Sequence, residues 1–186
     1  MIRKLLSRIG IVAVLTGLST GALAQQSYGW VEKIRIQPWD VEAKAKLDSG
    51  ALTSSMHAED IELFQRDDED WVRFTVELGD DEQGQRVTER IERPLFREFS
   101  VRGAGGRDQR AVVLMEVCIG NTVYQEQFSL RNRSNMNYPV LLGRRTIQHL
   151  GPIDVTQTFL INSECGGDAR VLSYNETEKD EGIGVN

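Results

Sequence analysis

The sequence predicts a mainly β domain with one short helix, and three observations support this prediction. Short runs that alternate between apolar and polar residues recur along the chain. Turns rich in glycine, asparagine and aspartate separate these runs. Only residues 144–150 have a helical pattern, which Gly151 and Pro152 close. The length of 186 residues indicates one domain rather than two.

The predicted strands share short, alternating or continuous apolar patterns. They cover residues 28–37, 41–47, 61–64, 71–78, 95–101, 111–119, 122–130, 138–143 and 153–161. Two hairpins are expected, one around the acidic turn 66–70 and one around Gly120-Asn121. The polar segment 80–90 is expected to form a long exposed loop, and the acidic stretch 174–186 a disordered tail.

The first 24 residues have the three-part pattern of a secretory signal peptide. Arg3, Lys4 and Arg8 form a basic start, residues 9–18 are apolar, and a small-residue cleavage site ends at Ala24. The apolar run is about half as long as a membrane-spanning helix needs to be. We therefore expect an exported protein, periplasmic or secreted, with no membrane span after cleavage.

The folded domain is then expected to cover residues 25–173, and it is strongly acidic. The net charge of the whole chain is −6, and the signal peptide carries three basic residues and no acidic one, so the mature charge is −9. This balance argues against binding to nucleic acid. With two histidines, two cysteines and no CxxC or HExxH pair, no metal site is expected. The chain also lacks a GxxxxGK[ST] loop, and we expect no cofactor.

Export would place the two cysteines in an oxidising compartment, where a disulfide can form. Cys118 lies in an apolar strand, in which a free buried cysteine fits equally well, and Cys165 lies in a polar stretch. Whether their Cα atoms come within bonding distance depends on the fold. Both the disulfide and the free thiols therefore stay open at this point.

The chemistry depends on the segment that follows the strand 41–47. Asp48-Ser49-Gly50 can hold a carboxylate at a tight turn, because Gly50 lets the backbone pass closely and Ser49 can form a hydrogen bond within the turn. Such tripeptides are also common as plain turns at strand ends. A second block farther along the chain, residues 138–144, changes this balance in favour of a functional site.

The two blocks together resemble the retropepsin-like aspartic peptidases, and most closely a bacterial branch of that group known as ATP-dependent zinc proteases. The first block is residues 45–58, around Asp48, and the second runs over residues 128–144 into Leu141-Leu142-Gly143-Arg144. The likeness extends over residues 29–155. It implies a single closed or partly open acid-protease barrel.

Carried onto this chain, the resemblance implies Asp48 as the catalytic aspartate. It also implies a supporting turn and a segment packed behind that turn; these are Ser49, Gly50, Ala51, Leu141, Leu142 and Gly143. Arg144 departs from the viral pattern, because the acidic partner expected four residues after the aspartate is Leu52 here. The role of Arg144 therefore stays open.

Further residues have two interpretations each. Gly103, Gly105 and Gly106 could form the tip of a flap over the site or a simple loop. His57 and His149 are best explained as structural residues, although His57 could line the site. The zinc and the ATP in the name of the resembling branch have no counterpart in these residues.

One chain supplies a single catalytic motif, whereas aspartic peptidases need two carboxylates that share a proton. An active enzyme would therefore be a homodimer that places two Asp48 residues at its axis and hydrolyses a polypeptide substrate. The alternative is a non-catalytic module on the same fold that binds a peptide or an envelope partner. The first hypothesis requires the two Asp48 carboxyl groups to meet, and the second does not.

Overall fold

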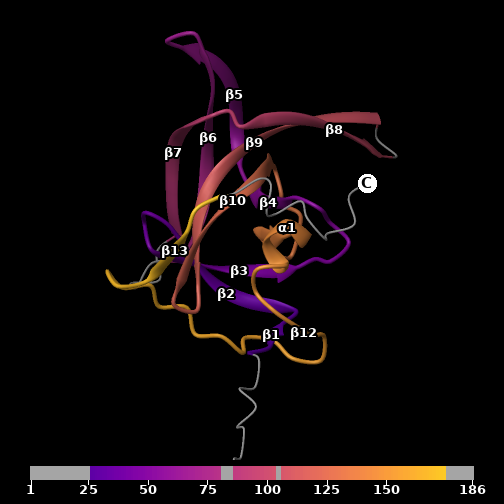
Figure 1. Cartoon of the computed structure of the whole chain (residues 1–186). Coiled ribbons are helices and arrows are strands. Elements are labelled where there is room, and N and C mark those ends of the chain that lie inside the picture. Colours follow the sequence, from indigo (N-terminus) through magenta and orange to yellow (C-terminus); the bar gives the residue numbers. More distant parts are fainter. Residues whose placement is uncertain (1–25, 81–85, 104–105, 175–186) are drawn as a thin grey trace, which may run out of the picture.

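The computed structural model describes residues 26–80, 86–103 and 106–174 (Figure 1). Six strands close a barrel in the order β10, β4, β11, β3, β2 and β9, and β9 pairs with β10 to complete the ring. Their bounds are β2 Val31–Ile36, β3 Val41–Leu47, β4 Ser54–His57, β9 Gly106–Ile119, β10 Thr122–Arg131 and β11 Val140–Leu142. The predicted mainly β barrel with one short helix is confirmed, and that helix is α1 (Arg144–Ile147).

The barrel closes around apolar side chains that alternate along its strands. Every second residue of β3 is buried, and Ile34, Phe128 and Leu142 reach into the core from three other strands. Such alternation is what a strand with one face on a core requires. Its regularity in β3 is the reason that this strand could be predicted.

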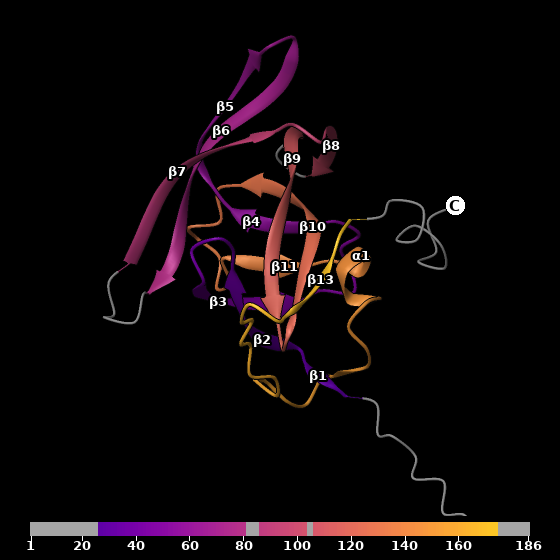
Figure 2. The ribbon, with the colours of Figure 1, turned by 60° about the vertical axis from the view of Figure 1, so that its left-hand side comes forward.

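Two more strands extend the barrel sheet at its ends. β8 (Arg97–Gly103) forms a hairpin with β9, and β13 (Arg170–Leu172) lies parallel to β10. A two-stranded pair, β1 (Tyr28–Gly29) with β12 (Ile153–Asp154), lies at the base of the barrel in Figures 1 and 2. The predicted hairpin around Gly120-Asn121 is confirmed by the pairing of β9 with β10.

A separate three-stranded sheet stands out from the barrel as an arm, which is most visible in Figure 2. It consists of β5 (Glu59–Arg66), β6 (Glu69–Asp80) and β7 (Arg86–Pro94). Val72, Phe74 and Val76 are fully buried on one face of β6. β5 pairs antiparallel with β6, with Arg66 opposite Glu69, so the hairpin predicted around the acidic turn is confirmed.

The expected loop over residues 80–90 is wrong for the part that the structure describes. β6 continues to Asp80 and β7 begins at Arg86, with Thr88 paired to Glu77 and Arg90 to Thr75. These polar residues pair across strands, so the segment lacks the apolar alternation by which strands are recognised. Residues 81–85 lie outside the described part.

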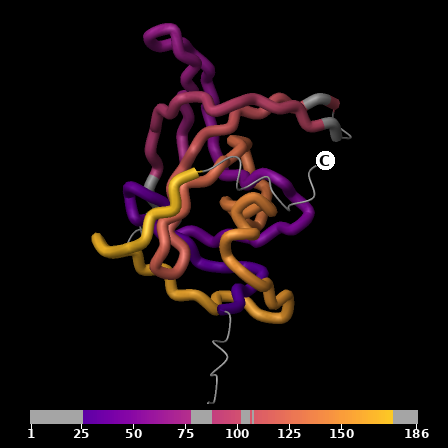
Figure 3. The backbone as a smooth tube through the Cα atoms, in the orientation of Figure 1, coloured from indigo at the N-terminus to yellow at the C-terminus, as the bar shows by residue number. Residues whose placement is uncertain are grey.

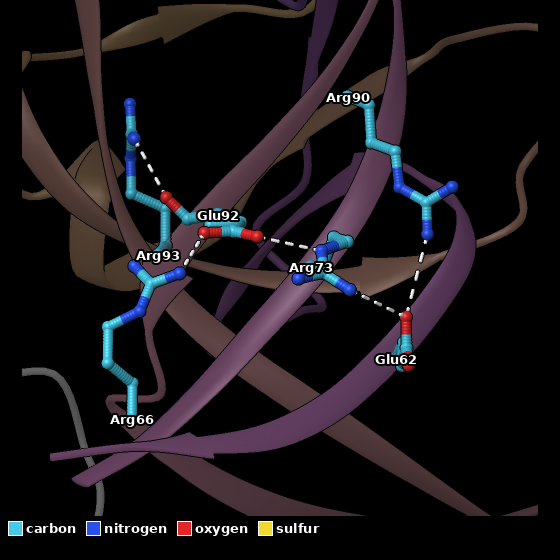
Figure 4. A network of polar contacts seen from close by, with 6 residues as sticks. All are labelled: Glu62, Arg66, Arg73, Arg90, Glu92 and Arg93. Carbon is cyan, nitrogen blue, oxygen red and sulfur yellow. Dashed lines mark hydrogen bonds and ion pairs between the residues drawn. The ribbon is translucent and has the colours of Figure 1, made fainter.

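Charged side chains on the outer face of the arm form one connected network (Figure 4). Arg73 donates to Glu92 at 2.7 Å and to Glu62 at 3.2 Å, and Arg90 lies 3.5 Å from Glu62. Arg66 pairs with the other oxygen of Glu92 and lies over the Trp71 ring. The arm is thus stabilised by packing on one face and by ion pairs on the other.

The expected strand over residues 153–161 is wrong beyond Asp154. From there the backbone follows the base of the barrel, as the tube in Figure 3 shows, and residues 155–169 belong to no strand. The Leu160 and Ile161 N–H groups donate to the fully buried Glu32 carboxylate, and the Phe159 N–H donates to the Val31 carbonyl at 2.9 Å. Phe159 has a φ of +57°, which is incompatible with a strand.

A disulfide joins Cys118 of β9 to Cys165, with 6.0 Å between the Cα atoms. It fixes the returning segment against the barrel just before β13. Of the two alternatives open from the sequence, the structure therefore has the disulfide. None of the described residues belongs to a helix that is long and apolar enough to cross a membrane.

Candidate active site

Asp48 lies at the end of β3, where the two sequence blocks meet. β11 runs parallel to β3 with Leu142 opposite Leu47, and the Asp48 N–H donates to the Leu142 carbonyl at 2.8 Å. The Asp48 carbonyl in turn accepts from Ala51 at 3.1 Å and closes the turn. The structure therefore brings Asp48 and the Leu141-Leu142-Gly143 segment together as the sequence predicts.

Both oxygens of the Asp48 carboxylate have partners. Oδ1 accepts the Gly50 N–H at 2.9 Å, and Oδ2 lies 3.5 Å from Nζ of Lys46. A Cβ atom at position 50 would lie 3.1 Å from Oδ1, so a glycine gives the carboxylate its room. The Asp48 side chain is 26% exposed, which leaves it accessible from the surface. It is fixed in orientation and still partly exposed to solvent.

Gly143 allows the loop after Gly50 to pass directly over β11. A Cβ atom at this position would lie 2.7 Å from the Leu52 carbonyl oxygen and 2.8 Å from the Thr53 carbonyl carbon. The Gly143 N–H donates to Ser54 Oγ at 3.0 Å, and Ser54 Oγ lies 2.8 Å from Thr146 Oγ1. Ser54 and Thr146 are buried and hold α1 behind the turn. They carry no sequence pattern that would have singled them out.

The structure assigns a role to Arg144 that the sequence left open. Its side chain donates to the Ser49 carbonyl at 2.9 Å, and its backbone N–H donates to the Ala51 carbonyl at 2.9 Å. Arg144 therefore ties α1 to the turn of Asp48 through two carbonyl groups. No acidic partner is needed for this contact.

Thr53, at the end of the same loop, accepts hydrogen bonds from two more arginine side chains. Arg97 of β8 and Arg145 of α1 each donate to its Oγ1 at 3.0 Å. Arg97 also donates to Gln127 Oε1 at 2.8 Å, and the Gln127 amide bonds the Tyr174 hydroxyl. A continuous line of hydrogen bonds thus connects the loop after Asp48 with Tyr174, two residues after β13.

Arg133 is a further cation near Asp48 that sequence reasoning did not single out. It is almost fully buried, and its Nε donates to the Tyr138 carbonyl at 3.2 Å. Burial lowers the pKa of Arg133, with further lowering by Arg131 and Arg110, while the Asp48 charge acts in the opposite direction. The surroundings of Asp48 are therefore basic, although the chain as a whole is acidic.

The glycines considered as a flap lie at the tip of the β8–β9 hairpin. Gly103 pairs with Gly106, and Gly106 has a φ of +104°. Gly105 lies outside the described residues. The hairpin extends beyond the barrel in Figure 1.

One cluster of described residues allows a test of whether this chain could hold the zinc in the name of the resembling branch. Ligand atoms of His57, Glu59 and Glu77 lie within 4.8 Å of one another. However, His57 Nδ1 accepts the Arg133 N–H at 2.9 Å, so the proton of the neutral ring is on Nε2, which faces Glu59 at 3.9 Å. A metal at Nε2 would have to displace that proton. The proton could not move to Nδ1, because Nδ1 already accepts the Arg133 N–H. These residues do not fit a zinc site, and no step is derived through one.

A closed six-stranded barrel with an aspartate turn supported by a Leu-Leu-Gly strand defines the class of retropepsin-like aspartic peptidases. The sequence profile described as "RimB-like: Retropepsin-like aspartic endopeptidase RimB" matches residues 27–164. The chain belongs to this RimB-like family.

Individual relatives support the same placement. Proteins called "Probable alpha-L-glutamate ligase" are 29% identical over 143 residues in Shewanella pealeana and 37% identical over 106 residues in Desulfotalea psychrophila. These matches cover 76% and 56% of this chain, but only 31% and 22% of the relatives. The chain thus spans a third or less of their length. A crystal structure of a Legionella pneumophila protein of unknown function has a TM-score of 0.60 and 30% identity, over 72% of this chain and 95% of that one.

Proposed function

We propose that the protein is an exported aspartic endopeptidase that is active as a homodimer. The observation that carries the proposal is Asp48, whose carboxylate is oriented by Gly50 and Lys46 at the end of a barrel strand and still partly exposed. A pair of such carboxylates that share one proton can activate a water molecule and protonate the peptide carbonyl oxygen. The described residues contain one such turn, so a second copy has to provide the other.

Two findings support export. The first 24 residues have the pattern of a signal peptide, and the Cys118–Cys165 disulfide is typical of proteins in an oxidising compartment. The proposal therefore places the mature enzyme in the periplasm or outside the cell. Expression of the full chain, followed by N-terminal sequencing of the exported product, tests it; a mature start at Gln25 is expected.

The basic surroundings of Asp48 favour polypeptides that carry carboxylates. Lys46, Arg133 and Arg144 surround a turn in a chain whose overall charge is negative. Relatives named as α-L-glutamate ligases share this domain as one part of a longer protein, which is consistent with an acidic substrate. We therefore expect peptides with glutamate or aspartate near the cleaved bond to be preferred over lysine-rich peptides of equal length.

A test compares the mature chain with Asp48→Asn on peptide libraries across pH 3 to 8. The amide cannot act as an acid or a base, so cleavage is expected to fall by at least about 10³-fold. Asp168→Asn is the matched control, because Asp168 is exposed in the loop before β13. Cleavage that survives in Asp48→Asn would overturn the proposal.

A non-catalytic binding module is the second candidate, and the Lys46–Asp48 ion pair is the observation that favours it. A carboxylate already compensated by a cation at 3.5 Å can serve to hold the turn in place without chemistry. This candidate predicts that no peptide is cleaved and that Asp48→Asn binds peptides as the original chain does. Crystals of a dimer with the two Asp48 carboxyl groups in hydrogen-bonding reach would count against it.

A further inference from the structure

Arg133 is a buried cation that no carboxylate of the described residues neutralises. The residue is 9% exposed, and within the described part of the chain its side chain makes a single hydrogen bond, from Nε to the Tyr138 carbonyl at 3.2 Å. Its two terminal nitrogens, Nη1 and Nη2, therefore have no acceptor there. Neither nitrogen is sealed in the interior, so both can be reached from solvent. A buried charge costs stability unless it is paired, and here the partner has to come from outside the described chain.

The loop between β10 and β11 fixes the direction of the Arg133 side chain. The Arg133 N–H donates to His57 Nδ1 at 2.9 Å, and the Arg133 carbonyl accepts the Met136 N–H at 2.8 Å. The ring of Tyr138, whose carbonyl holds Nε, packs edge-on against Trp30 with centroids 6.0 Å apart. The guanidinium is thus oriented before a ligand binds, which reduces the entropy that binding costs.

The carboxylates around this site have other partners. Burial lowers the pKa of Arg133, and the charges of Arg131 and Arg110 lower it further. These two arginines share Asp108, which accepts from Arg110 at 2.9 Å and lies 3.9 Å from Arg131. The Asp48 charge also acts on Arg133, but both Asp48 oxygens already have partners. An excess of positive charge therefore remains at the guanidinium, and it favours an oxyanion.

β11 connects the position of Arg133 with the turn of Asp48. Tyr138, which holds the guanidinium, lies two residues before β11, and Leu142 at the other end of β11 accepts the Asp48 N–H. At about 3.3 Å per residue, the backbone from Tyr138 to Leu142 spans roughly 13 Å. An extended peptide advances by at most about 3.5 Å per residue. With its scissile bond at Asp48, it would thus bring a residue about two to four positions away to Arg133, because both side chains cover part of the distance.

We propose that Arg133 binds a carboxylate of the polypeptide substrate through Nη1 and Nη2 and is a specificity-determining residue at that position. The planar guanidinium can donate two parallel hydrogen bonds to one carboxylate, whereas an ammonium group is a point charge. The carboxylate can belong to a glutamate or aspartate side chain or to the C-terminus of the bound chain. The effect on cleavage rests on the proposed peptidase function, whereas the binding of the carboxylate does not.

Three fluorescent peptides of equal length distinguish the two sources of the carboxylate. The first has one internal glutamate and an amidated C-terminus, the second has glutamine and a free C-terminus, and the third has glutamine and an amidated C-terminus. They are titrated with the mature Asp48→Asn chain, which lacks the carboxylate of the proposed cleavage step and leaves them intact. The first or the second is expected to bind at least about ten-fold more tightly than the third. Equal binding of all three would overturn the proposal.

A substitution at Arg133 assigns this preference to one side chain. In the same background, Arg133→Gln is expected to reduce the ratio of the two affinities to less than about two-fold. Arg170→Gln is the matched control and should keep the full ratio. Arg170 is an exposed residue of β13 opposite Thr122, and roughly 30 Å of β10 separate Thr122 from Arg131. Equal ratios in the two variants would contradict the assigned site.

Arg133→Lys separates carboxylate recognition from a purely structural role. Both Arg133→Lys and Arg133→Gln lose the bond from Nε to Tyr138, but only lysine keeps the charge. The lysine variant is therefore expected to retain an intermediate ratio, about three-fold, and it carries the comparison if the glutamine variant does not fold. A ratio in Arg133→Lys as low as that of a folded Arg133→Gln would contradict charge recognition. A ratio equal to that of the original side chain would contradict binding by the guanidinium fork.

Cleavage by the original mature chain locates the bound carboxylate along the substrate. One series of peptides moves a single glutamate along a neutral sequence, and a second series moves a free C-terminus. In one of them, kcat/KM is expected to be at least about ten-fold higher when the carboxylate lies two to four residues from the cleaved bond on one side. Arg133→Gln should flatten this maximum, and an equal effect at all positions would contradict a defined site. If no peptide is cleaved, the proposed peptidase function fails, while the binding measurements still decide whether Arg133 holds a carboxylate.

Discussion

The position of Asp48 depends on residues that are remote from it in sequence. Leu142 accepts its backbone N–H, and Gly143 leaves the space through which the next loop passes. Ser54 and Thr146 link that loop to α1 by hydroxyl groups that are buried and bonded to each other. The aspartate itself could be predicted from Asp-Ser-Gly and the Leu-Leu-Gly block. Its supporting hydroxyls could not, because serine and threonine occur in strands and loops of every kind.

Gly143→Ala tests the close approach at β11. The added methyl group would meet backbone atoms of Leu52 and Thr53 at less than 3 Å, and backbone cannot move aside as a flexible side chain can. We expect the free energy of unfolding to fall by about 1–3 kcal/mol in urea titrations, together with loss of peptide cleavage. Gly167→Ala is the matched control, since a Cβ atom there meets nothing within 4 Å. Equal stability of the two variants would contradict the argument.

His57 tests the metal argument at the level of one hydrogen bond. His57→Leu leaves the buried Arg133 N–H without an acceptor, which should cost about 1–3 kcal/mol in the free energy of unfolding. His57→Asn offers a carbonyl oxygen close to the place of Nδ1, so it should be less destabilised than His57→Leu. Thermal unfolding with and without zinc completes the test. A rise of Tm with zinc in the original chain that both variants lose would show that His57 is a metal ligand after all.

At the scale of elements, alternation predicted β3, every second residue of which is buried. The β9–β10 hairpin is buried along most of β10 and could be predicted from its apolar runs and its Gly-Asn turn. β4 has neither alternation nor an apolar run, because Ser54, Ser55 and His57 are all buried and polar. At the end of the segment 155–161, Glu32, more than a hundred residues away, accepts the N–H groups of Leu160 and Ile161 in place of a neighbouring strand. Long-range contacts of this kind have no local signal.

The disulfide connects β9 to the segment that leads into β13, and the sequence separation of its cysteines is 47 residues. In the chain-entropy description, closing a loop of this length stabilises the fold by about 4 kcal/mol, and measured values are commonly about 2–4 kcal/mol. Replacing both Cys118 and Cys165 by alanine should lower the free energy of unfolding by about 2–4 kcal/mol in urea titrations. Dithiothreitol should destabilise the original chain and leave the variant unchanged. A variant that is as stable as the original would contradict this role.

The arm should respond to pH through Glu92. Hydrogen bonds from Arg66 and then Arg73 hold the pKa of Glu92 below its ordinary value of 4.5. Because the folded pKa is the lower one, this contribution to stability is present above pH 4.5 and is lost as the pH falls through the folded pKa. The stability difference between the original chain and Glu92→Gln should therefore shrink as the pH is lowered from 6 to 3. Glu98→Gln is the control, because Glu98 is an exposed residue of β8, and its difference should not change in this way.

At the scale of the whole molecule, the barrel presents one aspartate turn on a locally basic surface of an acidic chain. The barrel, its single helix and the meeting of the two blocks at Asp48 agree with the prediction from sequence. Only the structure shows that the arm is a distinct sheet, and that the Cys118–Cys165 disulfide and the pairing of β13 with β10 hold the C-terminal segment against the barrel. The central claim of the proposed function is that two copies of Asp48 form a single catalytic centre.

Mixing the original mature chain with Asp48→Asn tests this claim most directly. After subunits have exchanged, the active fraction is the probability that both copies carry the aspartate, so activity falls with the square of the fraction of original chain. At an equal mixture we expect the cleavage rate per original chain to drop to about half of its unmixed value. A rate per original chain that stays constant across all mixtures would contradict a centre shared between two copies of Asp48.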